Sequence, residues 1–514
     1  MALTQKDIDE LLERRHPEFD DTKAHWEFLA ATYAGGRAWF DDNIFRYIKE
    51  GSTEYSDRVK RAYRFNHSRE IVDLVSKYIF KASVTRNTND APEEIKQFWR
   101  VSTLGGADIK QYIRQVNDKS SIYGKIWVVV DSTKSGSALS LQEEKEQAGD
   151  GRIYSYIVPP QHALDMSFDA LGELNWIKLY EEKRDDEDPF ESEGEVKGRY
   201  RIWTRNDWYL FAENTDTGKM ALMDSGTHGL GVVPVFAVDH METDESPYTA
   251  PSLIGDIAYL DRAVANYLSN LDAIIQDQTF SQMAMPAQGI LPGDSKYNAL
   301  VEMGTKRIFT YDGEGGAKPF FLSPDPRQAE LIITVIKQII NEIYHSVGMA
   351  GERTKQDNSM GIDNSSGVAK AYDFERVNAL LTSKAGALLR AEMRMIQLVM
   401  LWSGSASLDD FAQAPDEDEE ELVRYPETFD SRGLYDEFEI SSRLVLIDAP
   451  DTVRRQQMEQ LVDKLFPQLG KDLKKSIVSS LNSWPETEPA VTSGRSALQG
   501  AQNNPDTGAQ DNGQ

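Results

Sequence analysis

Two long stretches with helical periodicity constrain the fold of this 514-residue chain more than any other feature. Between Ser252 and Phe280, apolar residues recur every three or four positions, which places them on one face of an α-helix. The stretch from Pro326 to Val347 repeats this pattern and ends at Gly348. A helix of the first length extends roughly 40 Å, more than a single globular core needs to cover. The pattern alone predicts an antiparallel helical hairpin, as in a bundle.

A small module lies between the two predicted helices. Residues 307–311 and 319–322 are apolar runs typical of strands, and the turn-forming segment 312–316 joins them, which predicts a β-hairpin. The module is rich in aromatic residues, namely Tyr297, Phe309, Tyr311, Phe320 and Phe321. This is more apolar surface than so small a unit readily hides, so we expect it to contact a partner. The alternative is that the rings form the module's own core.

Composition and charge limit the class of protein. The chain is 40% hydrophobic and 27% charged, as in ordinary soluble proteins, and it has no cysteine for disulfides or thiolate metal sites. No apolar run reaches the roughly 18 residues of a membrane span, and the N-terminal residues lack the pattern of a signal peptide, so we expect a soluble, intracellular protein without a membrane partner. The net charge of −28 has the wrong sign for gripping nucleic acid.

The rest of the chain predicts an α+β, predominantly helical protein. Helices are expected at residues 3–15, 21–33, 55–80, 107–123, 368–402, 451–465 and 472–481. Strands of one antiparallel sheet are expected at residues 126–130, 153–158, 176–180, 200–204, 208–212 and 232–238, with a further short strand at 444–447. We also expect an exposed polar loop at 181–195, a helix bend at Gly386, an acidic linker at 409–421 and a disordered tail at 485–514.

Enzymatic motifs are absent from the sequence. It contains no phosphate-binding loop, no zinc-protease motif, no EF-hand and no nucleophile elbow, and its seven histidines have no ligand spacing. We therefore expect no catalytic residue, no metal and no cofactor. A basic cluster suggests nucleic-acid binding, but such a run is usually one solvated or partner-pairing helix face; its members are Arg58, Lys60, Arg61, Arg64 and Arg69.

The order of these elements resembles that of the portal, or head-to-tail connector, proteins of tailed bacteriophages, over about residues 20–485. The resemblance is carried by FLAATYAGGRAWF, NHSREIVDLVSKYIFKAS, DIKQYIRQVNDKSSIYGKIWVVVD and PPQHALDMSFDALGELNWIKLYEE. The passage from GVVPVFAVDH into SLIGDIAYLDRAVANYLSNLDAI is similar to the family's entry into its first stem helix. None of these segments is a catalytic signature, so the resemblance rests on their order.

The resemblance implies a ring of twelve subunits around a channel through which double-stranded DNA enters and leaves the capsid. By position, it implies a wing at 1–250, stem helices at 251–280 and 326–349, a clip at 281–325, a tunnel loop at 350–366, a long wing helix at 367–404, a crown at 405–484 and a disordered tail at 485–514. The implied location is the portal vertex of the virion, and the host cytoplasm during assembly.

The resemblance also implies partners and the residues that meet them. The partners are further copies of the chain, DNA bound without sequence choice, the large terminase, an adaptor or head-completion protein, and the major capsid and scaffolding proteins. The tunnel-loop residues expected to face DNA are Arg353, Lys355, Gln356, Asn358, Ser359 and Asn364. The clip residues expected to bind terminase or adaptor are Lys306, Arg307, Tyr311, Lys318 and Phe320.

Two other functions remain open at this point. A capsid scaffold or another structural phage protein without a channel would share the long helices and the acidity, but would not need a closed ring. A nuclease or packaging ATPase is disfavoured because the required motifs are missing. Asp188, Glu195 and Lys197 can be arranged as a nuclease-like set only within a charge-rich loop.

The loop between the second and third long helices gives a testable prediction. Links between packed helices usually take roughly two to eight residues, and longer ones are generally functional or disordered. We expect deletion of Gln356 to Ser365 to leave rings intact and to impair DNA packaging or retention in assembled heads. Normal packaging and retention by the deleted ring would show that the loop is only a surface connector.

Overall fold

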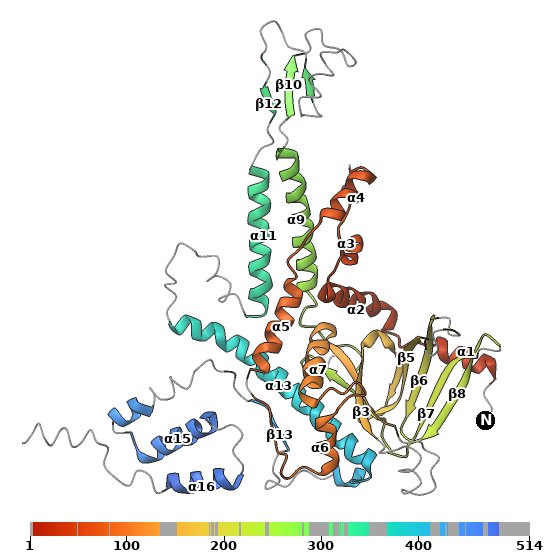
Figure 1. The fold of residues 1–514 in the computed structure, drawn as a ribbon, viewed down its shortest axis with the longest axis vertical. Coiled ribbons are helices and arrows are strands. Elements are labelled where there is room, and N and C mark those ends of the chain that lie inside the picture. Colours follow the sequence, from red (N-terminus) through yellow and green to blue (C-terminus); the bar gives the residue numbers. More distant parts are fainter. Residues whose placement is uncertain are drawn as a thin grey trace, which may run out of the picture. The chain divides into compact units, whose positions relative to one another are not determined.

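The computed structural model describes most of the chain, and its contacts divide the chain into two compact units. The described residues are 4–48, 50–81, 83–133, 152–184, 186, 190, 194–214, 217–241, 246–279, 282–286, 308–311, 318, 320–322, 327–348, 367–411, 422–426, 429, 441–447, 449–465 and 471–482. One unit comprises residues 1–82 and 87–427, and the other comprises 83–86 and 428–514. The protein is α+β, as predicted (Figure 1).

Seven helices precede the first long strand in the described part of the first unit. They are α1 (Gln5–Glu13), α2 (Phe19–Ala34), α3 (Ala38–Asn43), α4 (Ser52–Arg61), α5 (His67–Ile79), α6 (Glu93–Arg100) and α7 (Ile109–Tyr123). The single helix predicted over 55–80 is wrong, because the chain leaves the helix at Ala62 and starts a new one after Asn66. The Asn66 side chain accepts a hydrogen bond from the Arg69 N–H and so caps α5. Helices α3 and α6 were not predicted.

The strands of the body form two antiparallel sheets, whereas one was predicted. In the three-stranded sheet, β2 (Lys125–Ser132) lies between β3 (Ile153–Val158) and β9 (Val235–Asp239). The five-stranded sheet is a meander of consecutive strands: β4 (Ala163–Phe168), β5 (Leu174–Arg184), β6 (Val196–Thr204), β7 (Asp207–Asn214) and β8 (Lys219–Thr227). Strands β4 and β8 were not predicted, and a short 3-10 helix, Pro160–His162, leads into β4.

The loop predicted at 181–195 begins later than expected. Residues 181–184 continue β5 and pair with the start of β6. The Glu181 carboxylate lies 3.1 Å from Arg199 Nε and 2.8 Å from Arg201 Nε, both on β6. Cross-strand partners of opposite charge make a polar stretch compatible with a strand, which composition alone does not show.

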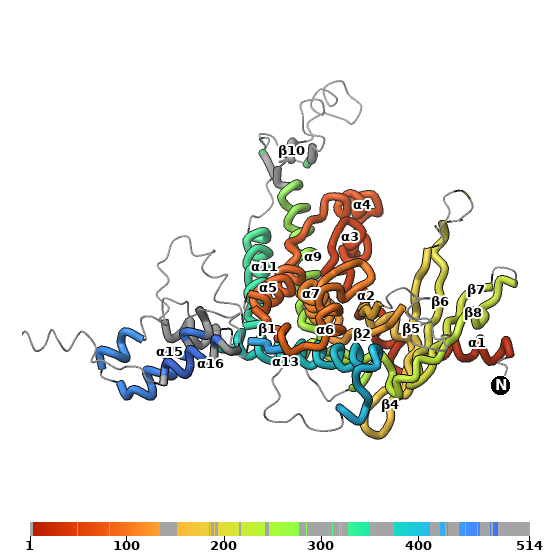
Figure 2. Tube along the Cα trace, turned by 60° about the horizontal axis from the view of Figure 1, so that its bottom comes forward, coloured from red at the N-terminus to blue at the C-terminus, as the bar shows by residue number. Residues whose placement is uncertain are grey.

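The core of the first unit lies around β2, which is buried along almost its whole length. Helices α7 and α13 (Gly367–Ser403) both contact β2 and β9. Figure 2 shows α13 passing along α6 and the sheet. The third long helix is therefore confirmed, and it ends at Gly404, where φ is 71°. The bend expected at Gly386 stays a prediction. The 3-10 turn Leu408–Phe411 and β13 (Val423–Arg424) follow α13.

The two long helices that opened the sequence analysis are α9 (Ile257–Thr279) and α11 (Arg327–Ser346), and they pack against each other. Figure 1 shows the pair projecting from the α+β body, with a small sheet beyond its far end. That sheet is made of β10 (Gln282–Pro286), β11 (Ile308–Tyr311) and β12 (Phe320–Leu322). The predicted hairpin is wrong: β10 occupies the centre, pairing in parallel with β11 and antiparallel with β12.

The second unit contains β1 (Thr85–Arg86) and the helices α15 (Asp451–Leu465) and α16 (Lys471–Asn482), which contact each other. Both helices were predicted. The strand expected at 444–447 is wrong, because residues 441–446 are helical and the Ile447 N–H donates to the Arg443 carbonyl at 3.1 Å. The tail from 485, most of the acidic linker and the loop at 350–366 lie outside the described residues.

Gly124, which joins α7 to β2, gives a stability prediction. Its φ is 84°, and a Cβ there would lie 2.0 Å from the Ala250 carbonyl oxygen just before the segment that leads into α9. We expect Gly124→Ala to lower the thermal unfolding midpoint strongly, because backbone strain of about 1–3 kcal/mol adds to that clash. Gly172→Ala is the control, since φ is 82° there and nothing lies within 4 Å of the added Cβ. Equal shifts for the two variants would contradict the close approach.

Candidate functional site

The base of the projecting helix pair is held by polar groups that are buried between α9 and the helices α3–α5. We call residues 38–61, which include α3, the loop after it and α4, the arm. Figures 1 and 2 show the arm and α11 on opposite sides of α9. Apolar packing joins arm and α9 through Trp39, Ile44, Val59 and Ala265. The polar contacts then fix how the arm and the helix meet.

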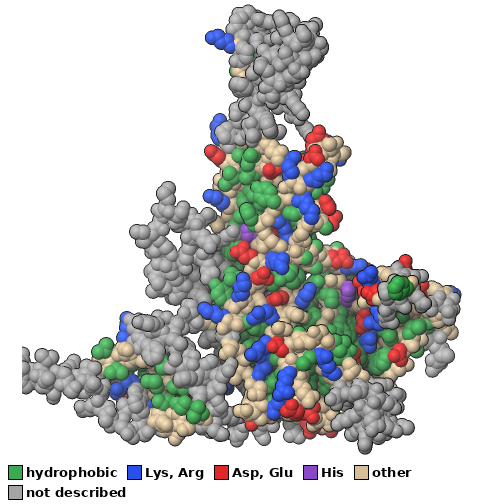
Figure 3. All heavy atoms as spheres, viewed as in Figure 1, with side chains coloured by type: hydrophobic (Ala, Val, Ile, Leu, Met, Phe, Trp, Pro, Cys, Tyr) green, Lys and Arg blue, Asp and Glu red, His purple; other side chains and the backbone are tan. Residues whose placement is uncertain are grey.

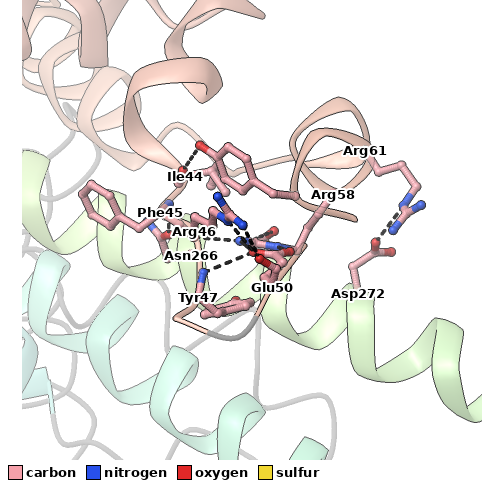
Figure 4. Close-up of polar contacts among 11 residues, drawn as sticks. Ile44, Phe45, Arg46, Tyr47, Glu50, Arg58, Arg61, Asn266 and Asp272 are labelled. Carbon is pink, nitrogen blue, oxygen red and sulfur yellow. Dashed lines mark hydrogen bonds and ion pairs between the residues drawn. The ribbon is translucent and has the colours of Figure 1, made fainter. Parts of the chain in front are cut away.

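Arg58 on α4 is the centre of the contact between the arm and α9 (Figure 4). Its side chain is 3% exposed, and its Nε lies 2.7 Å from the Glu50 carboxylate. The same guanidinium donates to the Ser269 hydroxyl on α9 at 2.9 Å and to the Phe45 carbonyl at 2.7 Å, and it stacks over the Tyr47 ring. Glu50 and Phe45 belong to the loop after α3 and Ser269 belongs to α9, so Arg58 joins that loop, α4 and α9.

Arg58 also determines the protonation of Glu50. Its hydrogen bonds hold the pKa of the Glu50 carboxyl below its usual value. The unfolded chain therefore takes up this proton more readily than the folded one. The contribution of the pair to stability is present above the ordinary carboxylate pKa and is lost as the pH falls through the folded value.

Asn266 and Asp272 add two further contacts along α9. The Asn266 amide accepts from the Phe45 N–H at 3.0 Å and donates to the Asn43 carbonyl at 2.9 Å, which satisfies the backbone where the arm leaves α3. The Asp272 carboxylate lies 3.5 Å from Arg61 Nε, as Figure 4 shows. Since both groups of this last pair are partly exposed, its contribution is small.

A second buried network surrounds Asp261, which is fully buried on α9. Its carboxylate accepts from the Ser68 N–H at 3.2 Å and the Ser68 hydroxyl at 3.0 Å, and lies 3.1 Å from His67 Nδ1. The Arg64 guanidinium is 3.6 Å away and 5% exposed. Burial lowers the pKa of Arg64 and the Asp261 charge opposes that effect. The N-terminus of α5 is thus fixed to α9 by a compensated buried charge.

The basic cluster of the sequence is now explained by these pairs. Each of its five members lies close to a carboxylate. The pairs are Arg58–Glu50, Lys60–Asp57, Arg61–Asp272, Arg64–Asp261 and Arg69–Asp73. The residues belong to α4, α5 and the segment between them, so they do not form one helix face. Arg58, Arg61 and Arg64 pair with other elements, whereas Lys60 and Arg69 pair within their own helices on exposed side chains. Nucleic-acid binding is not needed to account for them.

Lys384 connects α13 to α7 inside the body. Its side chain is completely buried, and its Nζ donates to the Ser120 hydroxyl at 2.6 Å. Burial lowers the pKa of this lysine to about 7, while the carboxylates of Asp118 and Asp239 act in the opposite direction. Because α13 continues from the loop at 350–366, this contact fixes the helix that follows the expected tunnel loop.

A cavity of about 780 Å³ lies between α7, β3 and the strands β5 and β6. Several of its charged groups are paired: Glu181 lies close to Arg199 and Arg201, and the Tyr154 hydroxyl donates to Asp131 at 2.9 Å. Asp118 and Lys119 also line the cavity. Among the described residues, no group of three potential metal ligands occurs.

The sequence-predicted site residues are placed only in part. All six expected DNA-facing residues of the loop, and Lys306 and Arg307, lie outside the described residues. In the small sheet of β10, β11 and β12, the Tyr311 hydroxyl donates to the Lys318 carbonyl at 3.1 Å. The rings of Tyr311 and Phe320 are 5.5 Å apart. Phe320 is nevertheless 49% exposed. The two aromatic residues therefore pack together and also leave apolar surface in contact with water.

Sequence reasoning missed Asp261 and Glu50. A signal for Asp261 existed, because the residue lies at helical spacing between Ile257 and Val264 within the apolar stripe of α9. An acidic residue in such a stripe indicates a buried partner. No comparable local signal marks Glu50, which lies in a loop and meets Arg58 only through the fold.

Comparisons with known proteins add little. No family model and no curated protein matches the chain. Among solved structures, it is similar to the neck of an empty GTA particle computed with C6 symmetry, with a TM-score of 0.37 and 11% identity. That alignment covers 72% of this chain and 87% of the other. A similarity this low carries no argument about function.

No described helix is long and apolar enough to cross a membrane.

The buried charge at Asp261 gives a prediction with an internal control. Asp261→Ala leaves the Arg64 guanidinium buried without its carboxylate, so we expect a loss of about 3–5 kcal/mol in the free energy of unfolding. Asp272→Ala removes a partly exposed pair from the same helix and should cost less than about 1 kcal/mol. Denaturant unfolding of both variants measures the difference. Similar small losses would show that Asp261 does not carry the anchor.

Proposed function

We propose that the chain is a phage portal protein, a subunit of a ring that forms a channel for double-stranded DNA at a capsid vertex. The observation that carries this proposal is the projecting pair of α9 and α11. Its helices pack against each other, yet α11 leaves Leu331 65% exposed and Ile333 41% exposed. A monomer gains nothing from such surface, whereas a ring buries it between copies.

The charge of the protein is compatible with a channel. At −28, the chain would repel the phosphates of DNA overall and would keep the DNA from binding tightly as it moves. Two arginines that could have bound phosphates, Arg58 in the arm and Arg64 after it, are instead buried in ion pairs. These two facts favour passage of DNA over retention.

The small sheet beyond the helix pair is the proposed clip. In this assignment it docks the terminase during packaging and later the adaptor, through exposed groups such as Phe320 and Lys318. The α+β body is the proposed wing, and residues 405–484 are the proposed crown. The capsid vertex is the proposed location, where the ring would also meet major capsid and scaffolding proteins.

The proposal predicts the assembly state of the purified protein. We expect closed rings of about a dozen copies with a central hole, because the exposed apolar surface of the helix pair is covered only between copies. Native mass spectrometry and negative-stain imaging measure the copy number and the hole. Monomers or dimers over a broad range of salt would contradict the proposal, and elongated or shell-like particles would favour a structural protein without a channel.

A further inference from the structure

The surface of α11 is divided into zones of different chemistry. At about 100° per residue, seven exposed polar side chains fall within roughly 100° of its circumference, and we call them the polar arc. They are Arg327, Glu330, Thr334, Lys337, Gln338, Asn341 and His345. The buried residues Ile336 and Ile343 lie on the opposite side, where α11 meets α9. Water, and not another helix, is the environment that suits the polar arc.

Leu331 and Ile333 lie on the two flanks between these zones. They are two positions apart in the sequence, so they point roughly 200° apart and differ by only about 3 Å in height along the helix. Both are substantially exposed. Figure 3, which looks at one flank of the helix pair, shows hydrophobic side chains gathered over it. Apolar surface is therefore present on the flanks of the helix pair, and the polar arc lies on the side of α11 that faces away from α9.

The arrangement of arm, α9 and α11 leaves two ways for a second copy to approach. Because the arm and α11 lie on opposite sides of α9, copies could stack arm against α11. The arm does expose apolar groups, among them Phe45 and Ile48. That contact, however, would cover the polar arc with apolar side chains and leave Glu330 and Lys337 without water. Approach from the flanks buries Leu331 and Ile333 and leaves the polar arc in water, although the exposed Gln328, Glu342 and Ser346 lie on the Leu331 side.

We infer that neighbouring copies pack side by side through α11, with Leu331 of one copy against Ile333 of the next. This inference rests on the proposed function, since it specifies the interface of the proposed ring. In a closed ring every copy stands at the same height, and the contact joins two different faces of the subunit. Two apolar side chains at nearly equal height on opposite flanks satisfy both conditions. The polar arc then faces the water of the channel.

The absence of cysteine from the chain allows a direct test by disulfide formation. The double variant Leu331→Cys/Ile333→Cys, assembled and then oxidised, should give a ladder of covalent oligomers that extends to the copy number of the ring. The two thiols of one helix point apart and cannot bridge within a chain. Each single variant should stay monomeric on a denaturing gel, and a mixture of the two singles should give dimers only, at least tenfold above the single variants.

Two control variants separate this interface from its alternatives. Thr334→Cys, in the polar arc, should not cross-link and should react with a water-soluble maleimide in the assembled ring. A ladder from Ile48→Cys combined with either flank cysteine would show that the arm packs on α11, and dimers from a single flank variant would show a two-fold contact. Either result overturns the inference.

The assembly state, measured by native mass spectrometry, distinguishes failure of the inference from failure of the proposed function. Intact rings of the double variant without any ladder would overturn the interface and leave the portal proposal standing. Absence of rings in the unmodified chain would overturn both.

Discussion

The structure of the projecting helix pair depends on charge that is buried and compensated at its base. A helix as long as α9 has little to hold its direction if only its partner α11 supports it. Asp261, enclosed by Ser68, His67 and Arg64, and Ser269, reached by Arg58, connect it to the body at two levels. Removing one member of such a network leaves another charge without a partner in a dry environment, so the network specifies one geometry.

This anchoring has a consequence for the free surfaces of the pair. With one side of α9 occupied by the arm and the other by α11, the apolar surface that remains is on the flanks. Flanks are where copies meet when subunits stand side by side around an axis. The polar arc of α11 is left as the surface that needs water. Length, amphipathicity and anchoring are thus all compatible with the ring that we propose.

The sequence predicted the elements whose signal is local. The helices α9, α11 and α13 were found because their apolar periodicity continues over several turns. The break between α4 and α5 was missed because one capping residue, Asn66, outweighs a continuing helical pattern.

Strand pairing was predicted less well, because it depends on residues far apart in the chain. The small sheet of β10, β11 and β12 is arranged around β10, whose methionines gave no strand signal next to a proline. Strand β5 extends through charged residues only because β6 supplies their partners. Of the anchor, Asp261 could have been recognised from its place in an apolar stripe. Glu50 could not, since nothing near it in the sequence indicates Arg58.

A three-dimensional reconstruction of the assembled protein by electron cryomicroscopy tests the central claim most directly. The account predicts a closed ring in which α11 is the innermost helix of each subunit, its polar arc faces the channel, and α9 and the arm lie at successively larger radii. A ring with the arm or α9 innermost, or an open helical filament in place of a ring, would contradict it.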